Sequence, residues 1–485
     1  MSTSTDTIVP RWGLMELTLQ GPAEGNPFTD VRLSACFRCG EYEAAVEGFY
    51  DGEGRYRIRF MPELEGDWTY SVSANCPALD GTRGSFVCSG REEGNHGPVR
   101  VKDEVHFQYA DGTRYTPIGT TGYVWHLQEE ELQEQTLRTL RQTPFNKIRM
   151  CVFPKHYEFN QAEPPIYPFA GSADEGFDFS RPNPAYFAHL ERRVKDLAEL
   201  GIEADLILFH PYDEGRWGFD RMTAEEDERY LRYVVARLSA FRNVWWSLAN
   251  EYDLMTHKRP EDWTRFFRIV QEEDPAGHLR SIHNCRTWYD FGVPWITHVS
   301  IQHSDVRVAS ECTKQYRKPV IIDECGYEGN LDKRWGSLTA EEMVLRMWEG
   351  RCRGGYVTHG ETYLGDEEEG PLWWSHGGSL KGQSVQRIRF FSRILEEAPA
   401  DMIYSSDRLD AATLEVSGEY YLQYFGPHRF SYREFSLPEG QYCVDLIDTW
   451  NMTITPLQGE FAGRFRIDLP AQLYYALRIR RAVNK

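Results

Sequence analysis

The sequence predicts a (β/α)8 TIM barrel of the α/β class, flanked by an N-terminal immunoglobulin-like β-sandwich and a C-terminal β-sandwich. Residues 10–98 show no helical periodicity, apolar strands alternate with amphipathic helices from about residue 105, and short strands return after Pro399. In addition, 485 residues exceed the roughly 250–300 that one hydrophobic core accommodates. We therefore expect three domains, at residues 1–98, 99–398 and 399–485.

The N-terminal domain is predicted from short alternating runs that are separated by Gly, Pro, Asn and Asp, as in an all-β sandwich. These runs cover residues 14–19, 31–37, 43–50, 56–60, 67–74 and 84–88. The polar stretch 91–98 ends in Gly97 and Pro98 and is predicted to be the linker to the barrel.

The central domain is predicted to hold eight strand and helix units, the number that closes a barrel. Strands are expected at residues 115–121, 147–153, 204–210, 244–250, 278–284, 298–303, 320–324 and 355–360. Helices are expected between them, and two of these begin at capping boxes, Thr223-Ala-Glu-Glu226 and Thr339-Ala-Glu-Glu342. A doubly wound parallel sheet is the alternative that this pattern leaves open.

The C-terminal domain is predicted from a return to short strands once the last helical pattern ends. The runs cover residues 413–416, 420–424, 441–448, 452–456, 463–469 and 474–480. Strands of this length and spacing are typical of a second sandwich. We expect the two flanking domains, together with the long loop after the eighth strand, to wall off one end of the cleft, and this favours exo action.

The composition of the chain indicates which kinds of ligand and which cellular location to expect. The formal net charge of −20 disfavours nucleic acid and anionic membranes, and no apolar stretch approaches 18 residues. Residues 1–10 carry no basic or apolar segment of a signal peptide and the ten cysteines are dispersed, so we expect a cytoplasmic protein. An aromatic content of 14% favours a small carbohydrate as ligand, because sugar C–H faces pack on rings. The sequence leaves room for a homo-oligomer.

Two glutamates at the ends of predicted buried strands are the strongest candidates for chemistry. Glu251 ends the fourth strand and Glu324, 73 positions later, ends the seventh. A buried, unpaired carboxylate costs several kcal/mol, so such a position indicates a function. Strands four and seven face each other across a barrel mouth, where two carboxyls about 5–5.5 Å apart act as nucleophile and as acid, then base.

Asn250-Glu251 after one strand and Glu324 at the end of a later one resemble the retaining (β/α)8 glycoside hydrolases, a superfamily that includes cellulases, β-galactosidases and apiosidases. Segments 60–68 and 354–362 resemble more closely a bacterial group with an N-terminal sandwich, an apiosidase-like barrel and a small C-terminal sandwich. The resemblance implies that Glu251 is the general acid/base and Glu324 the nucleophile. It also implies that Asn250 binds the sugar 2-hydroxyl, that Arg149 lies beside the nucleophile, and that His303 orients it.

The rim of the mouth is predicted from side chains at or just beyond strand ends. Histidines there are His210, His283, His303 and His359. Sugar contacts are expected from Tyr123, Trp125, Tyr212, Asp213, Trp217, Glu361, Trp373 and Trp374, because rings stack on sugars and carboxylates bind hydroxyls. Zinc is the alternative role for the histidines, but no HxH or HExxH spacing occurs and the retaining mechanism requires neither metal nor cofactor.

The function predicted from these residues is retaining glycoside hydrolysis by double displacement, exo-acting on small oligosaccharides or glycosides. The alternative is a non-catalytic carbohydrate-binding or scaffold protein on a degenerate barrel, although such a protein has no need of a matched acid and nucleophile. A Ser-His-Asp hydrolase is disfavoured because no GxSxG motif occurs.

Overall fold

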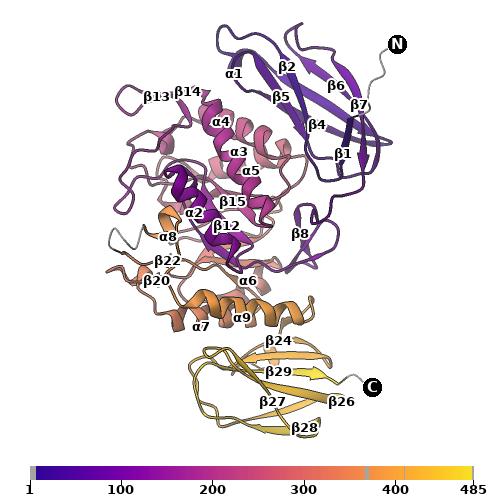
Figure 1. The fold of residues 1–485 in the computed structure, drawn as a ribbon, viewed down its shortest axis with the longest axis vertical. Coiled ribbons are helices and arrows are strands. Elements are labelled where there is room, and N and C mark those ends of the chain that lie inside the picture. Colours follow the sequence, from indigo (N-terminus) through magenta and orange to yellow (C-terminus); the bar gives the residue numbers. More distant parts are fainter. Residues whose placement is uncertain (1–6, 366–370, 409, 483–485) are drawn as a thin grey trace.

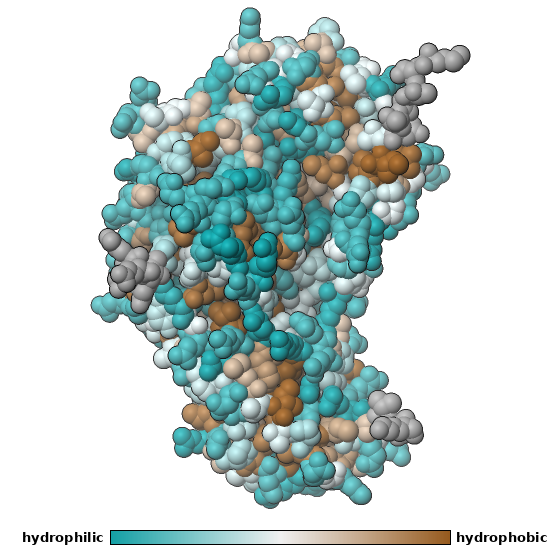
Figure 2. All heavy atoms as spheres, viewed as in Figure 1, coloured by the Kyte–Doolittle hydropathy of each residue, from teal (hydrophilic) through white to brown (hydrophobic). Residues whose placement is uncertain are grey.

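The computed structural model describes residues 7–365, 371–408 and 410–482. Three parts follow one another along the longest axis: a β domain near the N-terminus, a barrel wrapped in helices, and a second β domain at the C-terminal end (Figure 1). The face seen in Figure 2 is largely hydrophilic, with hydrophobic residues in small separate patches. Across the described ranges, every helix is too short or too polar to cross a membrane.

The N-terminal domain is all-β apart from one short helix, as predicted. Its elements are β1 (Thr7–Pro10), β2 (Met15–Gln20), α1 (Pro27–Asp30), β3 (Leu33–Cys39), β4 (Tyr42–Tyr50), β5 (Arg55–Phe60), β6 (Gly66–Ala74) and β7 (Arg83–Ser89). The strands pair in the order β1-β7-β6-β3-β4-β5-β2. β4 pairs with β3 through residues 42–47 and with β5 through residues 48–50, so it passes from one set of strands to the next. Phe37, Ile58 and Trp68 lie fully buried in its core. The immunoglobulin-like form of this domain stays a prediction.

A small antiparallel sheet precedes the barrel, made of β8 (Val99–Lys102), β9 (His106–Tyr109) and β10 (Arg114–Tyr115). Tyr115 was expected in the first barrel strand and instead belongs to this sheet. The reason is Pro117, which has no N–H to donate, so the barrel strand begins only at Gly119. Side chains of this sheet pack on Trp245 and Ile321, near the starts of two barrel strands, and so cover the amino-terminal end of the barrel.

The barrel strands of the described chain are β11 (Gly119–Thr121), β12 (Lys147–Cys151), β15 (Glu203–Phe209), β16 (Val244–Ala249), β17 (Arg280–Ser281), β18 (Val299–Gln302), β19 (Val320–Glu324) and β21 (Tyr356–Val357). Pairing between neighbours is parallel. Hydrogen bonds from Thr297 and Ser281 join β17 to the β18 side, and a parallel bridge between Thr120 and His359 closes the ring. Closure distinguishes this TIM barrel from a doubly wound sheet.

The helices around the barrel are α2 (Glu130–Arg141), α3 (Pro184–Glu199), α4 (Ala224–Leu238), α5 (Pro260–Glu273), α6 (Val308–Tyr316), α7 (Ala340–Cys352) and α9 (Ser384–Glu397). α4 begins at the predicted capping box, with Thr223 and Glu226 bonded reciprocally. At α7 only the Thr339 hydroxyl cap is present, accepting from the Glu342 amide at 3.2 Å. The described connection between β17 and β18 contains no helix.

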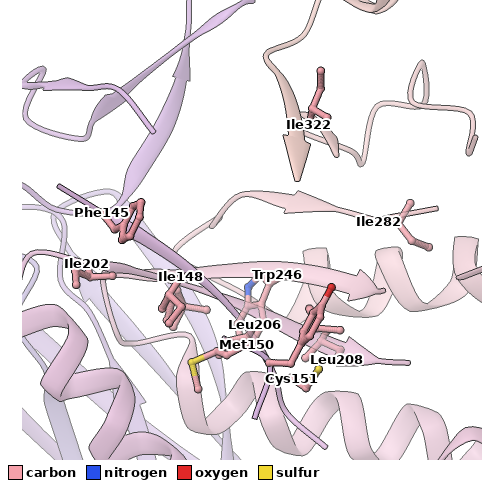
Figure 3. Close-up of a cluster of buried hydrophobic side chains, with 14 of the residues drawn as sticks. Phe145, Ile148, Met150, Cys151, Ile202, Leu206, Leu208, Trp246, Ile282 and Ile322 are labelled. Atoms are coloured by element: carbon pink, nitrogen blue, oxygen red, sulfur yellow. The ribbon is translucent and has the colours of Figure 1, made fainter. Parts of the chain in front are cut away.

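Loop elements stand above the strand ends. They are β13 (Phe169–Ser172), β14 (Gly176–Pro182), β20 (Glu328–Gly329), β22 (Glu361–Thr362), α8 (Trp373–His376) and the 3-10 turns Trp125–Leu127, Phe219–Arg221, Tyr252–Leu254 and Arg334–Gly336. Beneath them, Ile148 and Met150 of β12 pack with Leu206, Leu208 and Trp246 of the next strands in the fully buried core (Figure 3).

The C-terminal domain is also all-β. Its strands are β23 (Ile403–Tyr404), β24 (Ala412–Val416), β25 (Tyr420–Tyr424), β26 (Tyr432–Asp448), β27 (Thr453–Pro456), β28 (Phe461–Asp468) and β29 (Tyr475–Arg481), and a 3-10 turn spans Ser406–Arg408. β26 begins nine residues before the predicted start at residue 441, because a register shift between Ser436 and Gln441 lets one strand continue through Pro438. Its first half pairs with β28 and its second with β27.

Candidate active site

The carboxyl ends of the barrel strands open into a cavity of about 820 Å³. Five of the predicted site residues line it: Tyr123, Glu251, His303, Glu324 and Trp374. Tyr212, also predicted as a contact, lines it too. All lining residues fall between positions 123 and 374, so the walls come from the barrel and its loops. The expectation that the flanking β domains wall off the cleft is therefore wrong.

Glu251 and Glu324 face each other across this cavity, with Gln302 of β18 between them. Oriented so that its nitrogen faces these acceptors, the Gln302 amide donates to Glu251 Oε1 at 3.0 Å and to Glu324 Oε2 at 3.1 Å. The two oxygens can therefore be no farther apart than the sum of these distances, about 6.1 Å. One side chain thus fixes the relative positions of both carboxyl groups.

The two carboxyl groups have different surroundings. Burial, and then the negative charge of Glu324, raises the pKa of Glu251 to about 7. Glu324 accepts a hydrogen bond from the Tyr123 hydroxyl and lies 4.0 Å from His283 Nε2. Glu251 also has left-handed backbone, with φ 49° and ψ 51°. The site therefore places Glu251, which can keep its proton near neutral pH, beside Glu324, which accepts hydrogen bonds from Tyr123 and Gln302.

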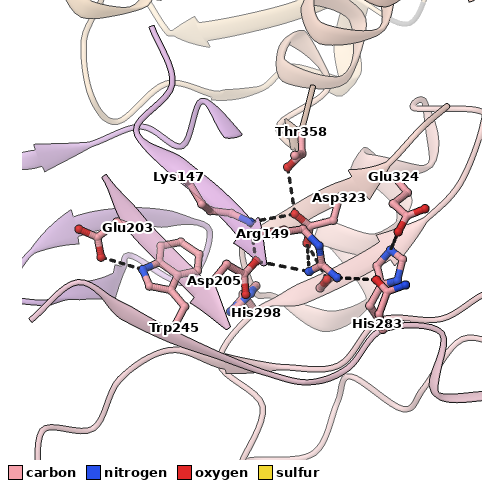
Figure 4. Close-up of polar contacts among 12 residues, drawn as sticks. Lys147, Arg149, Glu203, Asp205, Trp245, His283, His298, Asp323, Glu324 and Thr358 are labelled. Atoms are coloured by element: carbon pink, nitrogen blue, oxygen red, sulfur yellow. Dashed lines mark hydrogen bonds and ion pairs between the residues drawn. The ribbon is translucent and has the colours of Figure 1, made fainter. Parts of the chain in front are cut away.

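Asn250 and Arg149 are buried and do not line the cavity, although Asn250 directly precedes the lining residue Glu251. Arg149 Nη2 donates to Asn250 Oδ1 at 2.8 Å, which leaves Asn250 Nδ2 without a hydrogen-bond partner among the described residues. The predicted contact of Arg149 with the nucleophile is replaced by ion pairs to Asp205 and Asp323, at 3.3 and 3.5 Å. Figure 4 shows Arg149 beside Asp205 and Asp323 in the barrel interior. Arg149 thus orients Asn250 and does not bind Glu324.

The predicted histidine rim is only partly formed. His303 lines the cavity, but its Nδ1 lies 2.8 Å from the Asp305 carbonyl oxygen, and no hydrogen bond joins its ring to Glu324 among the described residues. His283 is the histidine nearest that carboxylate. His210 contacts the Phe153 carbonyl oxygen at 3.3 Å, and the fully buried His359 stacks on Phe145 and bonds Thr120.

The remaining predicted sugar contacts lie outside the cavity lining. Trp125 is fully buried in the core, Trp373 Nε1 donates to Thr120 at 3.0 Å, and Trp217 Nε1 donates to Glu163 at 3.0 Å. Asp213 accepts from the backbone amides of residues 215 and 219, and Glu361 accepts from those of residues 381 and 382. These side chains shape loops behind the wall, and their prediction as contacts is wrong in this structure.

Several cavity residues were not predicted from the sequence: Lys155, Tyr157, Cys285, Gln302, Tyr327 and Trp335. Gln302 ends β18 and Lys155 follows β12 by four positions. Their position at or after a strand end was therefore the feature of the sequence that could have indicated them as site residues. Position relative to a strand does not say which way a loop side chain turns, and this is the information that the sequence lacks.

A group that could hold a metal ion by its spacing is formed by Glu328, His359 and Glu361. Burial raises the pKa of Glu361 to about 7. Four successive backbone amides, of residues 381–384, already donate to the two carboxylates where α9 begins. The capping of this helix therefore explains both buried carboxylates without an ion.

Family models match three successive segments of the chain. One described as "Apiosidase-like, catalytic domain" matches residues 101–368. Two described as domains of unknown function, DUF5060 and DUF5605, match residues 8–75 and 409–480. Comparison with curated proteins gives no significant match.

Solved structures give the same picture. A protein from Bacteroides vulgatus ATCC 8482, provisionally described as a glycoside hydrolase, is 43% identical with a TM-score of 0.94, over 98% of this chain and 100% of its own. A family 5 glycoside hydrolase from the same organism is 16% identical, with a TM-score of 0.64 over 80% and 93% of the two chains. A third, described as a glycoside hydrolase, is 15% identical with a TM-score of 0.63 over 80% and 98%. The last two share the fold alone.

Proposed function

The chain belongs to the apiosidase-like catalytic domain family, and from this premise we propose that it is a retaining glycoside hydrolase acting by double displacement on small oligosaccharides or glycosides. The observation that carries the proposal is the bridge from Gln302 to Glu251 and Glu324. Retaining enzymes hold their carboxyl groups about 5–5.5 Å apart and inverting enzymes about 6.5–9.5 Å apart. The upper limit of about 6.1 Å between the bridged oxygens lies below the inverting range.

The roles follow from the different surroundings of the two glutamates. Glu251, with its pKa raised to about 7, can hold a proton and give it to the glycosidic oxygen as the bond to the leaving group breaks. The Glu324 carboxylate, held by Tyr123 and Gln302, attacks the anomeric carbon and forms the glycosyl-enzyme. Glu251 then takes a proton from water, which attacks the same carbon and releases Glu324.

Asn250 is the proposed ligand of the sugar 2-hydroxyl. Its oxygen is held by Arg149, so its free Nδ2 is the group left to donate. A hydrogen bond to this hydroxyl can strengthen as the oxocarbenium-like transition state forms and so contributes to catalysis as well as to binding.

Exo action is proposed from the loops around the cavity. Phe159, Trp335 and Trp374 come from the loops that follow β12, β19 and β21, and their rings meet at centroid distances of 5.1–6.3 Å. All three line the cavity. An aromatic wall on one side favours a substrate that enters by its end and disfavours a long chain that passes through.

The test is hydrolysis of a panel of nitrophenyl glycosides by the wild type, Glu251→Ala and Glu324→Ala. We expect proton NMR to show that the first sugar released by the wild type keeps its anomeric configuration. Loss of the acid/base should lower kcat/KM by about 10²- to 10⁴-fold, and loss of the nucleophile at least as much. Azide should restore turnover in both variants, giving a retained glycosyl azide from Glu251→Ala and an inverted one from Glu324→Ala.

Glu175→Gln is the matched control, because Glu175 is an exposed carboxylate in the turn between β13 and β14 and does not line the cavity. Its kcat/KM should equal that of the wild type. Inversion at the anomeric carbon would overturn the retaining mechanism. Full activity in Glu324→Ala would remove Glu324 from the mechanism, and sugar binding without hydrolysis by the wild type would favour the non-catalytic alternative.

A further inference from the structure

We propose that the cavity selects a sugar that carries an oxyanion, either a carboxylate or a sulfate ester, and that the ammonium group of Lys155 binds this oxyanion. The inference rests on the proposed function, because it takes the cavity to be the glycoside site. It goes further in naming a substrate class, anionic sugars, and the residue that distinguishes them from neutral ones.

Lys155 lies inside a set of aromatic rings. Its Nζ is 3.8 Å from the ring centroid of Tyr123, 4.0 Å from Tyr212, 4.3 Å from Tyr157 and 4.8 Å from Trp374. All four rings and Lys155 itself line the cavity. Ring faces attract a cation and hold it in place, but they supply no negative charge to neutralise it.

The ammonium of Lys155 lacks the partner that other buried lysines have. Lys155 is only 2% exposed, yet no hydrogen bond or ion pair joins its Nζ to a described residue. By contrast, Lys147 Nζ lies 2.6 and 2.9 Å from Asp205 and Asp323, and Lys258 Nζ lies 2.6 Å from Asp227. A buried ammonium without an acceptor is costly, so an anion that enters with the ligand would complete the site.

The location of Lys155 assigns the oxyanion to the sugar that is cleaved. Tyr123 has Lys155 over its ring and donates its hydroxyl hydrogen to Glu324. The ammonium is therefore separated from the proposed nucleophile by the ring of Tyr123 alone. This places it next to the sugar unit whose anomeric carbon Glu324 attacks. A substituent on that same sugar is within reach of Lys155.

The charges around Lys155 are compatible with an anionic ligand. Burial lowers the pKa of Lys155 to about 8, while Cys151, Glu324 and Glu251 act in the opposite direction, so the group is mostly protonated at neutral pH. Lys333 and Arg334 line the same cavity, together with the acidic Glu158 and Glu214. Lys333 pairs with Glu158 at 3.6 Å, whereas Arg334 forms no ion pair within the described ranges. The cavity lining as a whole carries four basic side chains against four glutamates, so it lacks the excess of negative charge that the chain has overall.

The experiment is isothermal titration of the wild type, Lys155→Met and Lys155→Arg with free monosaccharides in matched pairs. The anionic probes are D-glucuronate, D-galacturonate and D-galactose 6-sulfate, and the neutral partners are D-glucose and D-galactose. We expect the wild type to bind at least one anionic probe ten-fold or more tightly than its neutral partner. Lys155→Met should abolish this preference without changing the affinity for neutral sugars, and Lys155→Arg should keep it.

Lys314→Met is the control, because it removes an exposed lysine from α6. It should bind like the wild type. Equal or tighter binding of the neutral sugars by the wild type would overturn the inference, as would an equal loss of both kinds in Lys155→Met, which would mean that Lys155 only supports the aromatic wall. If the fold of Lys155→Met is damaged, as judged by circular dichroism, Lys155→Gln takes its place, with the same outcomes expected.

Failure of this inference can be separated from failure of the proposed function. Hydrolysis of neutral glycosides without any preference for anionic sugars would leave the glycosidase standing and remove the role of Lys155. Preferential binding of an anionic sugar without hydrolysis of its nitrophenyl glycoside would support the role of Lys155 and contradict the proposed glycosidase activity.

Discussion

At the scale of the residue, Glu251 combines its proposed catalytic role with a cost in stability. Glu251 is 8% exposed, and burial and the charge of Glu324 together raise its pKa from 4.5 to about 7. The folded protein therefore keeps a proton there that the unfolded chain has already lost. A carboxyl with this pKa suits proton transfer near neutral pH, and the same shift means that its ionisation destabilises the fold.

We expect Glu251→Gln to stabilise the protein in a pH-dependent way. The folded-state pKa lies above the unfolded value, so stability falls as pH rises from about 4.5 to about 7, and a neutral amide avoids that loss. At about 1.4 kcal/mol per pKa unit, the gain should be near zero at pH 4.5 and on the order of 3 kcal/mol at pH 8. Denaturant unfolding at both values measures it. An equal gain in stability at pH 4.5 and pH 8 would contradict ionisation of Glu251 as the cause. The control Glu175→Gln should show no gain at either pH.

Site residues could be predicted from the sequence where a polar residue ends an apolar strand. Glu251 and Glu324 interrupt strands that are otherwise apolar, and such an interruption is visible in the sequence. Trp125 and His359 stand at equally plausible positions, but they turn into the core. Lys155 lies in a loop whose path depends on contacts with Tyr212 and Trp374, residues distant in sequence. No local pattern contains that information.

At the scale of the element, β12 carries charge into the barrel interior. Alternate residues point to opposite faces of a strand, so Lys147 and Arg149 share one face while Ile148 and Met150 pack on the other. Asp323 of β19 accepts from Lys147 at 2.9 Å and from the hydroxyls of Ser300 and Thr358 at 2.6 and 2.9 Å. The nearby cations hold the pKa of Asp323 well below its usual range despite its burial.

Asp323→Asn should lower the free energy of unfolding by about 3–5 kcal/mol, because removing one partner of a buried ion network leaves charges uncompensated. Ser300→Ala is the matched control: it removes one hydrogen bond from the same carboxylate and should cost about 1 kcal/mol. Urea unfolding measures both. Equal losses in the two variants would mean that the charge of Asp323 contributes nothing beyond its hydrogen bonds.

The order of the elements could be predicted better than their limits. The alternation of strands and helices predicted all eight barrel strands in the described chain, because each unit has its own periodicity. The ends differed where one residue decides: Pro117 delays β11, and the shift before Gln441 lengthens β26. The doubly wound alternative was excluded only by contacts between the first and last strands, such as Thr120 with His359.

At the scale of the whole molecule, a buried ion cluster joins the N-terminal β domain to the barrel. Arg59 of β5 and Arg237 of α4 both pair with Glu191 of α3, and Arg237 also lies 2.8 Å from Asp51. Arg59 is 4% and Arg237 1% exposed. In Figure 1 the N-terminal domain lies against the same helices. Long-range pairs of this kind could not be predicted from the sequence.

Glu191→Gln should weaken this junction. Two buried guanidinium groups would lose their shared anion, so we expect a loss of about 3–5 kcal/mol and a separate, earlier unfolding transition of the N-terminal domain in calorimetry. Glu43→Gln, in an exposed pair with Arg38, should change stability by no more than about 0.5 kcal/mol. A single unchanged transition in Glu191→Gln would show that apolar contacts alone hold the two parts together.

The left-handed backbone at Glu251 has a consequence for transplanting this chemistry. On a straight strand, the neighbours Asn250 and Glu251 would point to opposite faces, and only one of them could reach the sugar. In the proposed mechanism both side chains contact the sugar, and the corner at Glu251 is the backbone feature that would let two consecutive side chains face the same mouth. The corner and the dipeptide are therefore one unit: an Asn-Glu pair grafted onto another barrel without the corner would turn one of its two functional groups away from the substrate.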